Sequence, residues 1–228
     1  MDTIFPAWPP STLAVANQTA RYQVRRIFCV GRNYAEHIRE MGHEPNTAPP
    51  SYFTKFPESV VESGVSIEYP PGTSDFHYEV ELVLAIGREG FDVPQTDAQN
   101  YIYGYAVGLD MTRRDLQLAS RDKGLPWDTG KNFSQSAPIS VIQPSSNVGH
   151  PREGKIWLEV DGKRKQDSDI GDMIWGPDQI IADLSKLYTL LPGDLIMTGT
   201  PAGVGPVVSG QMLRGHIDGL EDLIISIA

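Results

Sequence analysis

The segment that most restricts the possible folds of this chain is Phe76–Ile86 (FHYEVELVLAI), a predicted strand in which two glutamates interrupt an apolar pattern. One face of this strand carries Tyr78, Val80, Leu82, Leu84 and Ile86, and the other carries His77, Glu79, Glu81, Val83 and Ala85. Because both faces are largely apolar, we expect the strand to be buried on both sides. The fold must then neutralise two buried carboxylates, since an unpaired buried charge is very costly.

Glu79 and Glu81 lie two positions apart, so both carboxylates leave the same face of the strand, with Cα atoms about 6.6 to 7 Å apart. A solvated outer face is the commoner origin of a Glu-x-Glu pattern, but the apolar neighbours argue against it here. A divalent cation would neutralise both groups. With a single cysteine in the chain and no paired histidines nearby, oxygen ligands favour Mg²⁺ or Mn²⁺ over Zn²⁺.

Asp110 follows the next apolar strand, predicted over Tyr101–Leu109. It is either the N-cap of a short helix expected from about Thr112 to Ser120 or, if its strand lies beside the first, a third ligand of the cation. Arg114 and Gln117 are four and seven residues further on, where they could meet an anionic substrate or form a solvated helix face.

His37 and Glu40 lie three residues apart on a predicted short helix that Asn33 would cap and Gly42 would end. A carboxylate beside an imidazole orients the ring and raises its basicity, as a general base acting on water requires. A surface His–Glu pair has the same spacing, so the pattern alone leaves both interpretations open.

Three further side chains lie in turn-rich segments. Lys55 and Lys131 stand beside aromatic residues and could stabilise an oxyanion or enolate, although a solvent-facing lysine is the simpler alternative. Thr200 belongs to a glycine-rich turn (MTGTPAGVG) after a predicted strand, where backbone amides and the hydroxyl could bind a carboxylate. The turn lacks the GxxxxGK[ST] pattern of a phosphate-binding loop.

The remaining pattern predicts many short strands and few helices. An Asp161-Gly162 turn indicates a hairpin of Lys155–Val160 with Lys163–Gln166, and Gln179–Leu190 has helical periodicity. Further strands are expected at Val24–Val30, Ser51–Phe56, Val65–Tyr69, Asp194–Thr198, Met212–Ile217 and Leu223–Ile227. We therefore predict an α+β, mainly β domain over residues 23–228, a rolled sheet or sandwich, preceded by an N-terminal arm or cap over residues 1–22.

The charge and composition exclude several classes of function. The 228 residues carry a net charge of −10, which argues against sequence-independent nucleic-acid binding. We see no run near the roughly 20 apolar residues of a membrane span and no signal-peptide pattern. A single cysteine fits a reducing compartment, so we expect a cytoplasmic protein with no membrane or nucleic-acid partner.

Taken in order, six motifs resemble the fumarylacetoacetate hydrolase family from about Val24 to the C-terminus. They are CVGRNYAEHIREMG, YFTKFPESVV, DFHYEVELVLAIG, YGYAVGLDMTRRDLQ, GKNFSQSAPI and GDLIMTGTPAGVGPV. The resemblance implies a mixed β-sandwich roll, a homodimer, a bound Mg²⁺ or Mn²⁺, and hydrolysis of a carbon–carbon bond in a β-diketo acid. The compact form and the GRNYAEH opening look most like the acylpyruvate hydrolases of the family, especially those that act on fumarylpyruvate in gentisate-type aromatic degradation.

The resemblance also assigns roles to residues of this chain. It implies that Glu79, Glu81 and Asp110 bind the metal, that His37 with Glu40 activates water, and that Lys131 steadies developing negative charge. Arg114, Gln117 and Thr200 match positions that hold the carboxylate and keto oxygens of the substrate. Lys55 matches a lysine that proline usually follows directly, whereas Phe56 intervenes here.

The family also contains decarboxylases and isomerases, and the metal site does not separate them. Oxaloacetate decarboxylation or another enolate-forming reaction is therefore the alternative activity, and a metal-stabilised binding protein without turnover is a further one. The acyl group would be recognised by loops such as Gly42–Pro50 and Asp122–Trp127. His43 and Arg39, in or near the first loop, could meet a second carboxylate.

Overall fold

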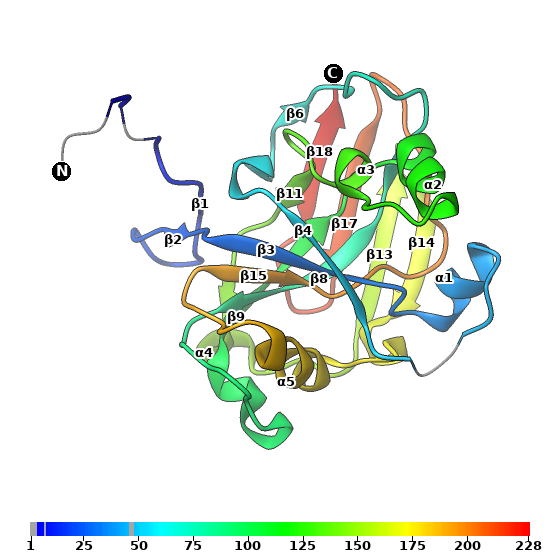
Figure 1. The fold of residues 1–228 in the computed structure, drawn as a ribbon. Helices are drawn as coiled ribbons and strands as arrows, with labels where there is room; N and C mark the ends of the chain where they lie inside the picture. The colour runs from blue at the N-terminus through cyan, green and yellow to red at the C-terminus, as the bar shows by residue number, and fades with distance from the viewer. Residues whose placement is uncertain (1–3, 7, 46–47) are drawn as a thin grey trace.

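The computed structural model describes residues 4–6, 8–45 and 48–228. Its largest element is a curled sheet (Figure 1). Its strands, in spatial order, are β4 (Ser51–Lys55), β3 (Arg26–Gly31), β15 (Asp194–Met197), β8 (Val80–Ile86), β9 (Ile102–Leu109), β11 (Ala137–Ile139) and β5 (Val60–Glu62), and β12 (Gln143–Pro144) also pairs with β9.

A second sheet packs against the first. It consists of β14 (Lys163–Asp169), β13 (Lys155–Val160), β17 (Met212–Ile217), β18 (Leu223–Ile227) and β6 (Ser66–Ile67), in that order. A small third sheet contains β10 (Thr112–Arg113), β7 (Phe76–Tyr78) and β16 (Gly205–Pro206). The predicted mainly β roll with short helices is confirmed.

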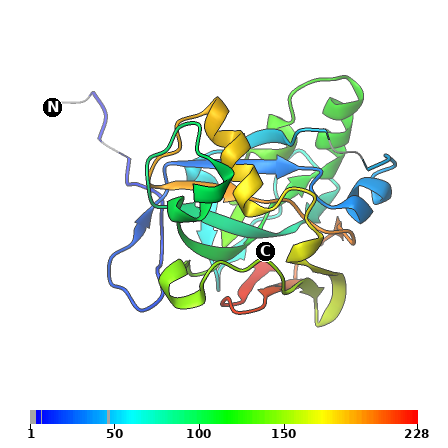
Figure 2. The same ribbon diagram turned by 90° about the horizontal axis from the view of Figure 1, so that it is seen from below.

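The helices are short and lie around the sheets. They are α1 (Ala35–Glu40), α2 (Arg114–Asp122), α3 (Asp128–Lys131), α4 (Ser145–Val148) and α5 (Pro177–Leu187), with 3-10 turns at Pro57–Ser59, Gln95–Tyr101 and Ile170–Asp172. Figure 1 shows α1, α2 and α3 on the same side of the molecule, whereas α5 crosses one face of the large sheet (Figure 2). Among the described residues, no helix is long and apolar enough to cross a membrane.

Strand β8 lies at the centre of the fold and is buried along its whole length. Its Val80, Leu82, Leu84 and Ile86 belong to the larger core cluster, and Val83 and Ala85 belong to the second cluster on the opposite face. The prediction of a strand buried on both sides is therefore confirmed. This burial is the reason why any charge on the strand must be neutralised by the protein or by a ligand.

The predicted strand Phe76–Ile86 is wrong in one respect, because the structure divides it at Glu79. The first part, β7, pairs with β10 and β16, and the second part, β8, pairs with β15 and β9. The chain thus changes sheets at Glu79, and its carboxylate reaches cations on the helices that follow β9. A continuous strand would keep one set of neighbours along its length.

Most other element boundaries agree with the sequence pattern within two or three residues. The hairpin turn is confirmed, with φ of 50° at Asp161 and 72° at Gly162, as a tight type I′ connection requires. The helix predicted over Gln179–Leu190 is α5, which starts earlier because Pro177 occupies its first turn. The helix predicted from Thr112 begins at Arg114, because Thr112–Arg113 pairs with β7 instead.

Asn33 does not cap α1 as predicted, because Tyr34 occupies the N-cap position without a side-chain cap. The Asn33 amide instead donates to the backbone oxygens of Trp175 (2.9 Å) and Thr198 (2.7 Å) and accepts from the Trp175 N–H (2.7 Å). These buried bonds tie the start of α1 to the end of β15, so they set where α1 stands relative to the sheet.

The N-terminal segment crosses the second face of the large sheet. Strand β1 (Thr12–Leu13) pairs with β2 (Tyr22–Gln23), and Leu13 and Val15 are buried in the second core cluster. Residues 12–22 therefore cover that face. The division into an arm over residues 1–22 and one domain over residues 23–228 stays a prediction.

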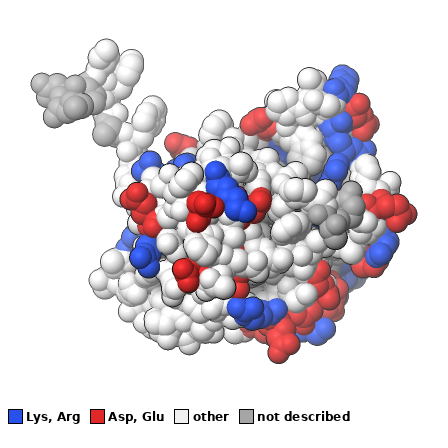
Figure 3. Space-filling model, turned by 60° about the horizontal axis from the view of Figure 1, so that its bottom comes forward, with Lys and Arg blue, Asp and Glu red and all other residues white. Residues whose placement is uncertain are grey.

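In Figure 3, acidic and basic side chains are interspersed on the face in view.

We expect Leu82→Ala to lower the free energy of unfolding by about 3 kcal/mol, because Leu82 is fully buried and its removal leaves a cavity at the centre of the core. Leu187→Ala is the matched control, since 62% of that side chain is exposed, and it should cost less than about 0.5 kcal/mol. Denaturant unfolding followed by fluorescence measures both values. Equal effects would contradict the placement of β8 in the core.

Candidate active site

Three carboxylates meet where β8 and β9 lie side by side. Glu79 stands between β7 and β8, Glu81 is on β8, and Asp110 directly follows β9. One oxygen atom from each carboxylate lies within 4.8 Å of the others, and all three side chains are buried. The backbone N–H of Asp110 donates to the Glu79 carbonyl (2.9 Å), which extends the β8–β9 pairing and fixes this arrangement. The structure therefore brings together all three residues predicted as metal ligands.

Two of these carboxylates are neutralised by buried cations. Lys131 Nζ donates to Glu79 Oε2 (2.8 Å), Asp110 Oδ2 (2.6 Å) and the hydroxyl of Thr112 (2.8 Å). Arg114 also forms an ion pair with Glu79. Burial opposes ionisation of Glu79, but Lys131 and Arg114 together lower its pKa well below the usual range. Burial likewise opposes the charge on Lys131, yet Asp110 and Glu79 raise its pKa.

Glu81 has a different environment, because no cationic side chain in the described part of the chain forms an ion pair with it. Its carboxylate accepts one hydrogen bond, from the backbone N–H of Gly199 (2.7 Å). Burial and the neighbouring charges of Asp110 and Glu79 raise its pKa well above the usual value. Asp110 Oδ1 also lacks a hydrogen bond, although Lys55 Nζ lies 2.9 Å away as an ion pair. This set of three buried oxygen donors, one of them without a cationic partner in the described part of the chain, fits a hard divalent cation.

His37 and Glu40 form the predicted pair on α1. His37 Nδ1 lies 3.0 Å from Glu40 Oε2, and Glu40 Oε1 accepts from the backbone N–H of Gly203 (2.9 Å). Burial works against ionisation of Glu40, but the hydrogen bonds from His37 and Gly203 lower its pKa below the usual value. Because Glu40 occupies Nδ1, the imidazole has Nε2 left to act on a group in the cavity.

Arg114 and Gln117 lie in α2, where the Arg114 guanidinium donates to the Gln117 side-chain oxygen (3.1 Å). Helix α3 packs very closely on this helix at Gly130. A Cβ atom at Gly130 would lie 2.7 Å from the backbone nitrogen of Gln117, so only glycine permits the contact. This close approach places Lys131 beside the carboxylates.

Thr200 also lines the cavity, and buried Gln166 holds it there. The Gln166 side-chain amide donates to the Thr200 hydroxyl (2.8 Å) and to the Pro201 carbonyl (2.8 Å), and its oxygen accepts from the Val80 N–H (2.9 Å). Gln166 was not predicted, because every residue of β14 is polar and nothing in the sequence distinguishes this one from its neighbours.

Lys55 does not lie where a substrate-binding residue was expected. It is buried, is absent from the cavity wall, and directs its ammonium group to Asp110 Oδ1 and to the backbone carbonyls of Met111 (3.2 Å) and Lys131. Lys55 therefore contacts the carboxylate cluster from the side that faces away from the cavity. The register of β4 beside β3, which carries Lys55 inward, decides this placement.

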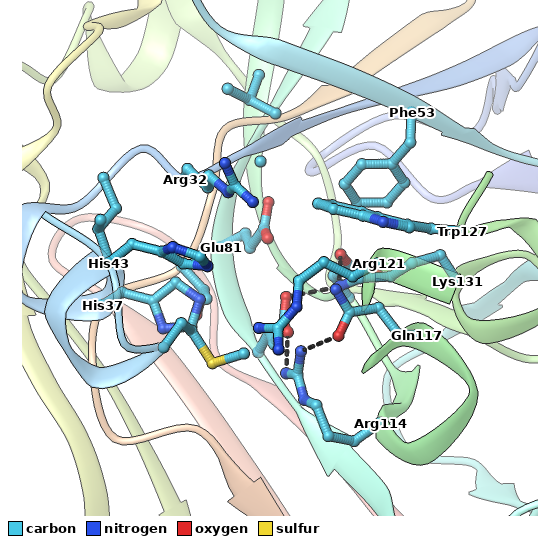
Figure 4. Close-up of a pocket in the computed structure, with 17 residues that line it drawn as sticks. Arg32, His37, His43, Phe53, Glu81, Arg114, Gln117, Arg121, Trp127 and Lys131 are labelled. Atoms are coloured by element: carbon cyan, nitrogen blue, oxygen red, sulfur yellow. Dashed lines mark hydrogen bonds and ion pairs between the residues drawn. The ribbon is translucent and has the colours of Figure 1, made fainter. Parts of the chain in front are cut away.

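The cavity is lined by residues from five segments of the chain, and Figure 4 shows how the labelled side chains face one another. His37, the carboxylates, Arg114, Gln117, Lys131 and Thr200 all contribute to the wall. Sequence analysis pointed to His43 and Trp127 through their loops but missed Phe53, Arg32 and Arg121, which also line the wall, and Arg39 is not part of it. Arg32 and Phe53 stand within motifs that carry the family resemblance, but no chemical pattern in the sequence singled out any of the three residues as part of a site.

Comparison with known proteins shows which family has this fold and this arrangement. The family model for the C-terminal domain of fumarylacetoacetate hydrolase matches residues 26–227. The chain belongs to this family. It is a hydrolase that acts on carbon–carbon bonds, as the sequence motifs predicted.

Individual relatives cover nearly the whole chain. A fumarylpyruvate hydrolase of a Ralstonia species is 53% identical over 77% of this chain and 91% of its own length. A mitochondrial oxaloacetate tautomerase of Arabidopsis thaliana is 44% identical over 88% and 90% of the two chains. The crystal structure of fumarylpyruvate hydrolase from Pseudomonas aeruginosa in complex with Mn²⁺ and pyruvate has a TM-score of 0.97 and 46% identity and covers 100% of this chain and 99% of its own.

We expect Mn²⁺ or Mg²⁺ to raise the melting temperature of the wild-type protein, because a cation that binds only the folded state stabilises it. Glu81→Gln should abolish most of this shift, since it removes the carboxylate that has no cationic partner. Glu36→Gln, which changes an exposed acidic residue on α1, should leave the shift unchanged. Thermal unfolding with EDTA and with added metal measures the effect, and an undiminished shift in Glu81→Gln would contradict the assigned site.

The lowered pKa of Glu40 predicts a pH-dependent contribution to stability. A carboxylate with a depressed pKa in the folded state stabilises the protein above its unfolded pKa of roughly 4.3 and loses this contribution as the pH falls through the folded value. The difference in free energy of unfolding between wild type and Glu40→Gln should thus be largest near neutral pH and shrink below about pH 4. Denaturant unfolding across this pH range measures it, and a difference independent of pH would be inconsistent with the His37–Glu40 pair.

Proposed function

We propose that this protein hydrolyses a carbon–carbon bond in an acylpyruvate with the help of a divalent cation, and that fumarylpyruvate is its substrate, which yields fumarate and pyruvate. The observation that carries the proposal is His37, which lines the same cavity as the carboxylate cluster and is bonded through Nδ1 to Glu40. The similarity to fumarylpyruvate hydrolases over most of the chain supports the same reaction.

The donor set of the site suits Mg²⁺ or Mn²⁺. We assign Glu79, Glu81 and Asp110 as the residues that hold the cation, since they supply three buried carboxylates. When bound, it would act as a Lewis acid toward the oxygens of the 2-oxo acid and the enolate charge that develops there. Arg114, Gln117 and Thr200 also line the cavity and would hold the carboxylate and keto oxygens of the substrate.

His37 is the residue that we assign to water activation. Its free Nε2 would take a proton from a water molecule, and the resulting hydroxide would attack the distal carbonyl carbon of the substrate. Glu40, held by the Gly203 N–H, keeps the ring oriented and stabilises the imidazolium that forms. The bond between the acyl carbon and the pyruvate methylene carbon then breaks, and the electron pair passes to pyruvate enolate. The enolate carbon takes a proton from the His37 imidazolium, which restores the neutral ring, and the new carboxyl group of fumarate releases its proton to solvent.

Lys131 would stabilise the enolate through its charge. All three of its N–H bonds already have acceptors, at Glu79, Asp110 and Thr112, so no donor is left over for a substrate atom. A buried positive charge at hydrogen-bond distance from the carboxylate cluster still lowers the energy of nearby developing negative charge. Lys55, behind Asp110, would serve the same cluster as a positioning residue.

A reaction on oxaloacetate is the second candidate, because a tautomerase of that compound is 44% identical to this chain. Decarboxylation or tautomerisation of a 2-oxo acid needs enolate stabilisation, which the carboxylate cluster and Lys131 would support. It does not need an attacking water molecule. A binding protein without turnover is the third possibility, and it predicts stabilisation by metal with no consumption of any 2-oxo acid.

His37→Gln separates these candidates. We expect it to lower the rate of fumarylpyruvate hydrolysis by roughly 10³-fold, the usual effect of losing a general base, and to change any consumption of oxaloacetate only a few-fold. An absorbance assay of diketo-acid loss, with Mg²⁺ or Mn²⁺ and with EDTA, measures both reactions. His150→Gln, which changes a histidine bonded to Tyr105 away from the cavity, is the matched control.

Two outcomes would overturn the proposal. Full hydrolytic activity in His37→Gln would remove His37 from the reaction. No loss of fumarylpyruvate, acetylpyruvate or any other acylpyruvate by the wild-type enzyme with metal present would reject the hydrolase. The expected homodimer, the cytoplasmic location and the lack of nucleic-acid or membrane partners stay predictions from the sequence.

A further inference from the structure

The cavity carries a positive charge that the protein does not neutralise. Arg114 and Lys131 are paired with the carboxylate cluster, and Arg121 is bonded to Asp122 (2.9 Å). Arg32 also lines the cavity, but its guanidinium forms no hydrogen bond or ion pair with any residue that the structure describes. An arginine that faces a cavity without a partner is suited to bind an anionic group of a ligand.

The backbone at Arg32 is held in a conformation that arginine disfavours. Its φ is 61°, in the left-handed region that mainly glycine and asparagine adopt. The next residue, Asn33, is anchored by its hydrogen bonds to Trp175 and Thr198. These bonds hold the backbone of the turn in this conformation. Strain that the surrounding structure maintains is typical of functional positions, and here it directs the Arg32 side chain to the cavity.

Arg32 lies across the cavity from Arg114 and Gln117, two of the residues that would hold the oxygens of the 2-oxo acid. Figure 4 shows Arg32, His43 and His37 on one side and Arg114, Gln117 and Lys131 on the other. Arg32 and His43 also line an adjoining hollow that leads to the segment around Pro49–Ser51. A substrate whose reacting carbonyl lies near His37 would therefore extend its acyl group toward Arg32.

Two aromatic rings form a third wall of the same cavity. Phe53 on β4 and Trp127 before α3 have ring centroids 5.9 Å apart and stand beside the space between the two polar sides (Figure 4). The two ring planes are tilted by 55° to each other, so a planar conjugated chain can lie against the face of one of them. A fumaryl group is planar and ends in a carboxylate.

We propose that Arg32, with His43 beside it, forms a subsite for the carboxylate at the end of the acyl group farthest from the pyruvate portion. This subsite would make the enzyme select acylpyruvates with two carboxylates over those with one. The inference rests on the proposed function, since it takes the orientation of the substrate from it. Arg32 is then a specificity-determining residue that contacts substrate and takes no part in the bond-breaking step.

Two matched substrates test the proposal. Fumarylpyruvate carries the distal carboxylate, and crotonoylpyruvate has a methyl group in its place with the same planar chain. We expect Arg32→Asn, which suits the left-handed backbone, to lower kcat/KM for fumarylpyruvate about 30-fold, mainly through KM, and to change the value for crotonoylpyruvate less than about twofold. Arg32→Lys keeps the charge and should lose less.

Arg39→Asn is the control, because Arg39 is exposed, is paired with Glu36 and does not line the cavity. It should leave both substrates within about twofold of wild type. Equal losses for both substrates in Arg32→Asn, or no loss for either, would overturn the subsite. A melting temperature close to wild type verifies that Arg32→Asn is folded.

Failure of the proposed function would be recognised separately, because wild-type enzyme would then consume neither substrate. The subsite is still tested in that case by titrating fumarate and crotonate into the Mn²⁺-loaded protein and following tryptophan fluorescence. Arg32→Asn should weaken fumarate binding about tenfold or more and leave crotonate binding unchanged. Equal affinity of wild type and Arg32→Asn for fumarate would reject the subsite.

Discussion

The structure depends on neutralising three carboxylates that are buried at the centre of the fold. Strand β8 is enclosed on both faces, so Glu81 and its neighbours Glu79 and Asp110 are almost entirely buried and meet only the cavity that they line. Lys131 and Arg114 supply positive charge to Glu79, and Lys55 stands behind Asp110. Glu81 retains only a backbone donor, so the site has a remaining demand for a cation. The carboxylate oxygens that must be neutralised for the protein to fold are therefore the same atoms that would bind the metal.

The elements around the cluster are positioned by a few polar or close contacts. The bonds of Asn33 tie α1, and with it His37, to the end of β15. The missing side chain at Gly130 lets α3 approach α2, which brings Lys131 to the carboxylates. Gln166 holds Thr200 from the second sheet. The cavity is therefore a product of several segments far apart in the chain, each held to the central sheet by hydrogen bonds that leave little freedom.

Much of this site could be predicted, because its residues follow local patterns. Glu79 and Glu81 stand out in an apolar strand, Asp110 ends the next strand, and His37 and Glu40 share a helix turn. Other features could not be predicted, because they depend on long-range contacts. The change of sheets at Glu79, the structural role of Asn33 and the place of Lys55 behind Asp110 each involve partners more than 50 residues away or a strand pairing that no local pattern encodes.

The sequence by itself determined the burial of β8, the three carboxylates that meet beside it and the His–Glu pair, since periodicity and residue chemistry act over a few positions. The family motifs extended this to nearly the whole chain. Only the tertiary structure decided which lysine and arginine side chains pair with the carboxylates and which have no such partner in the described part of the chain. The sequence pointed to Arg114 and Lys131 and not to Arg32, but packing pairs the first two with buried acids and leaves Arg32 without an ion pair among the described residues. Charge pairing is a property of distances in space, so sequence position could not reveal it.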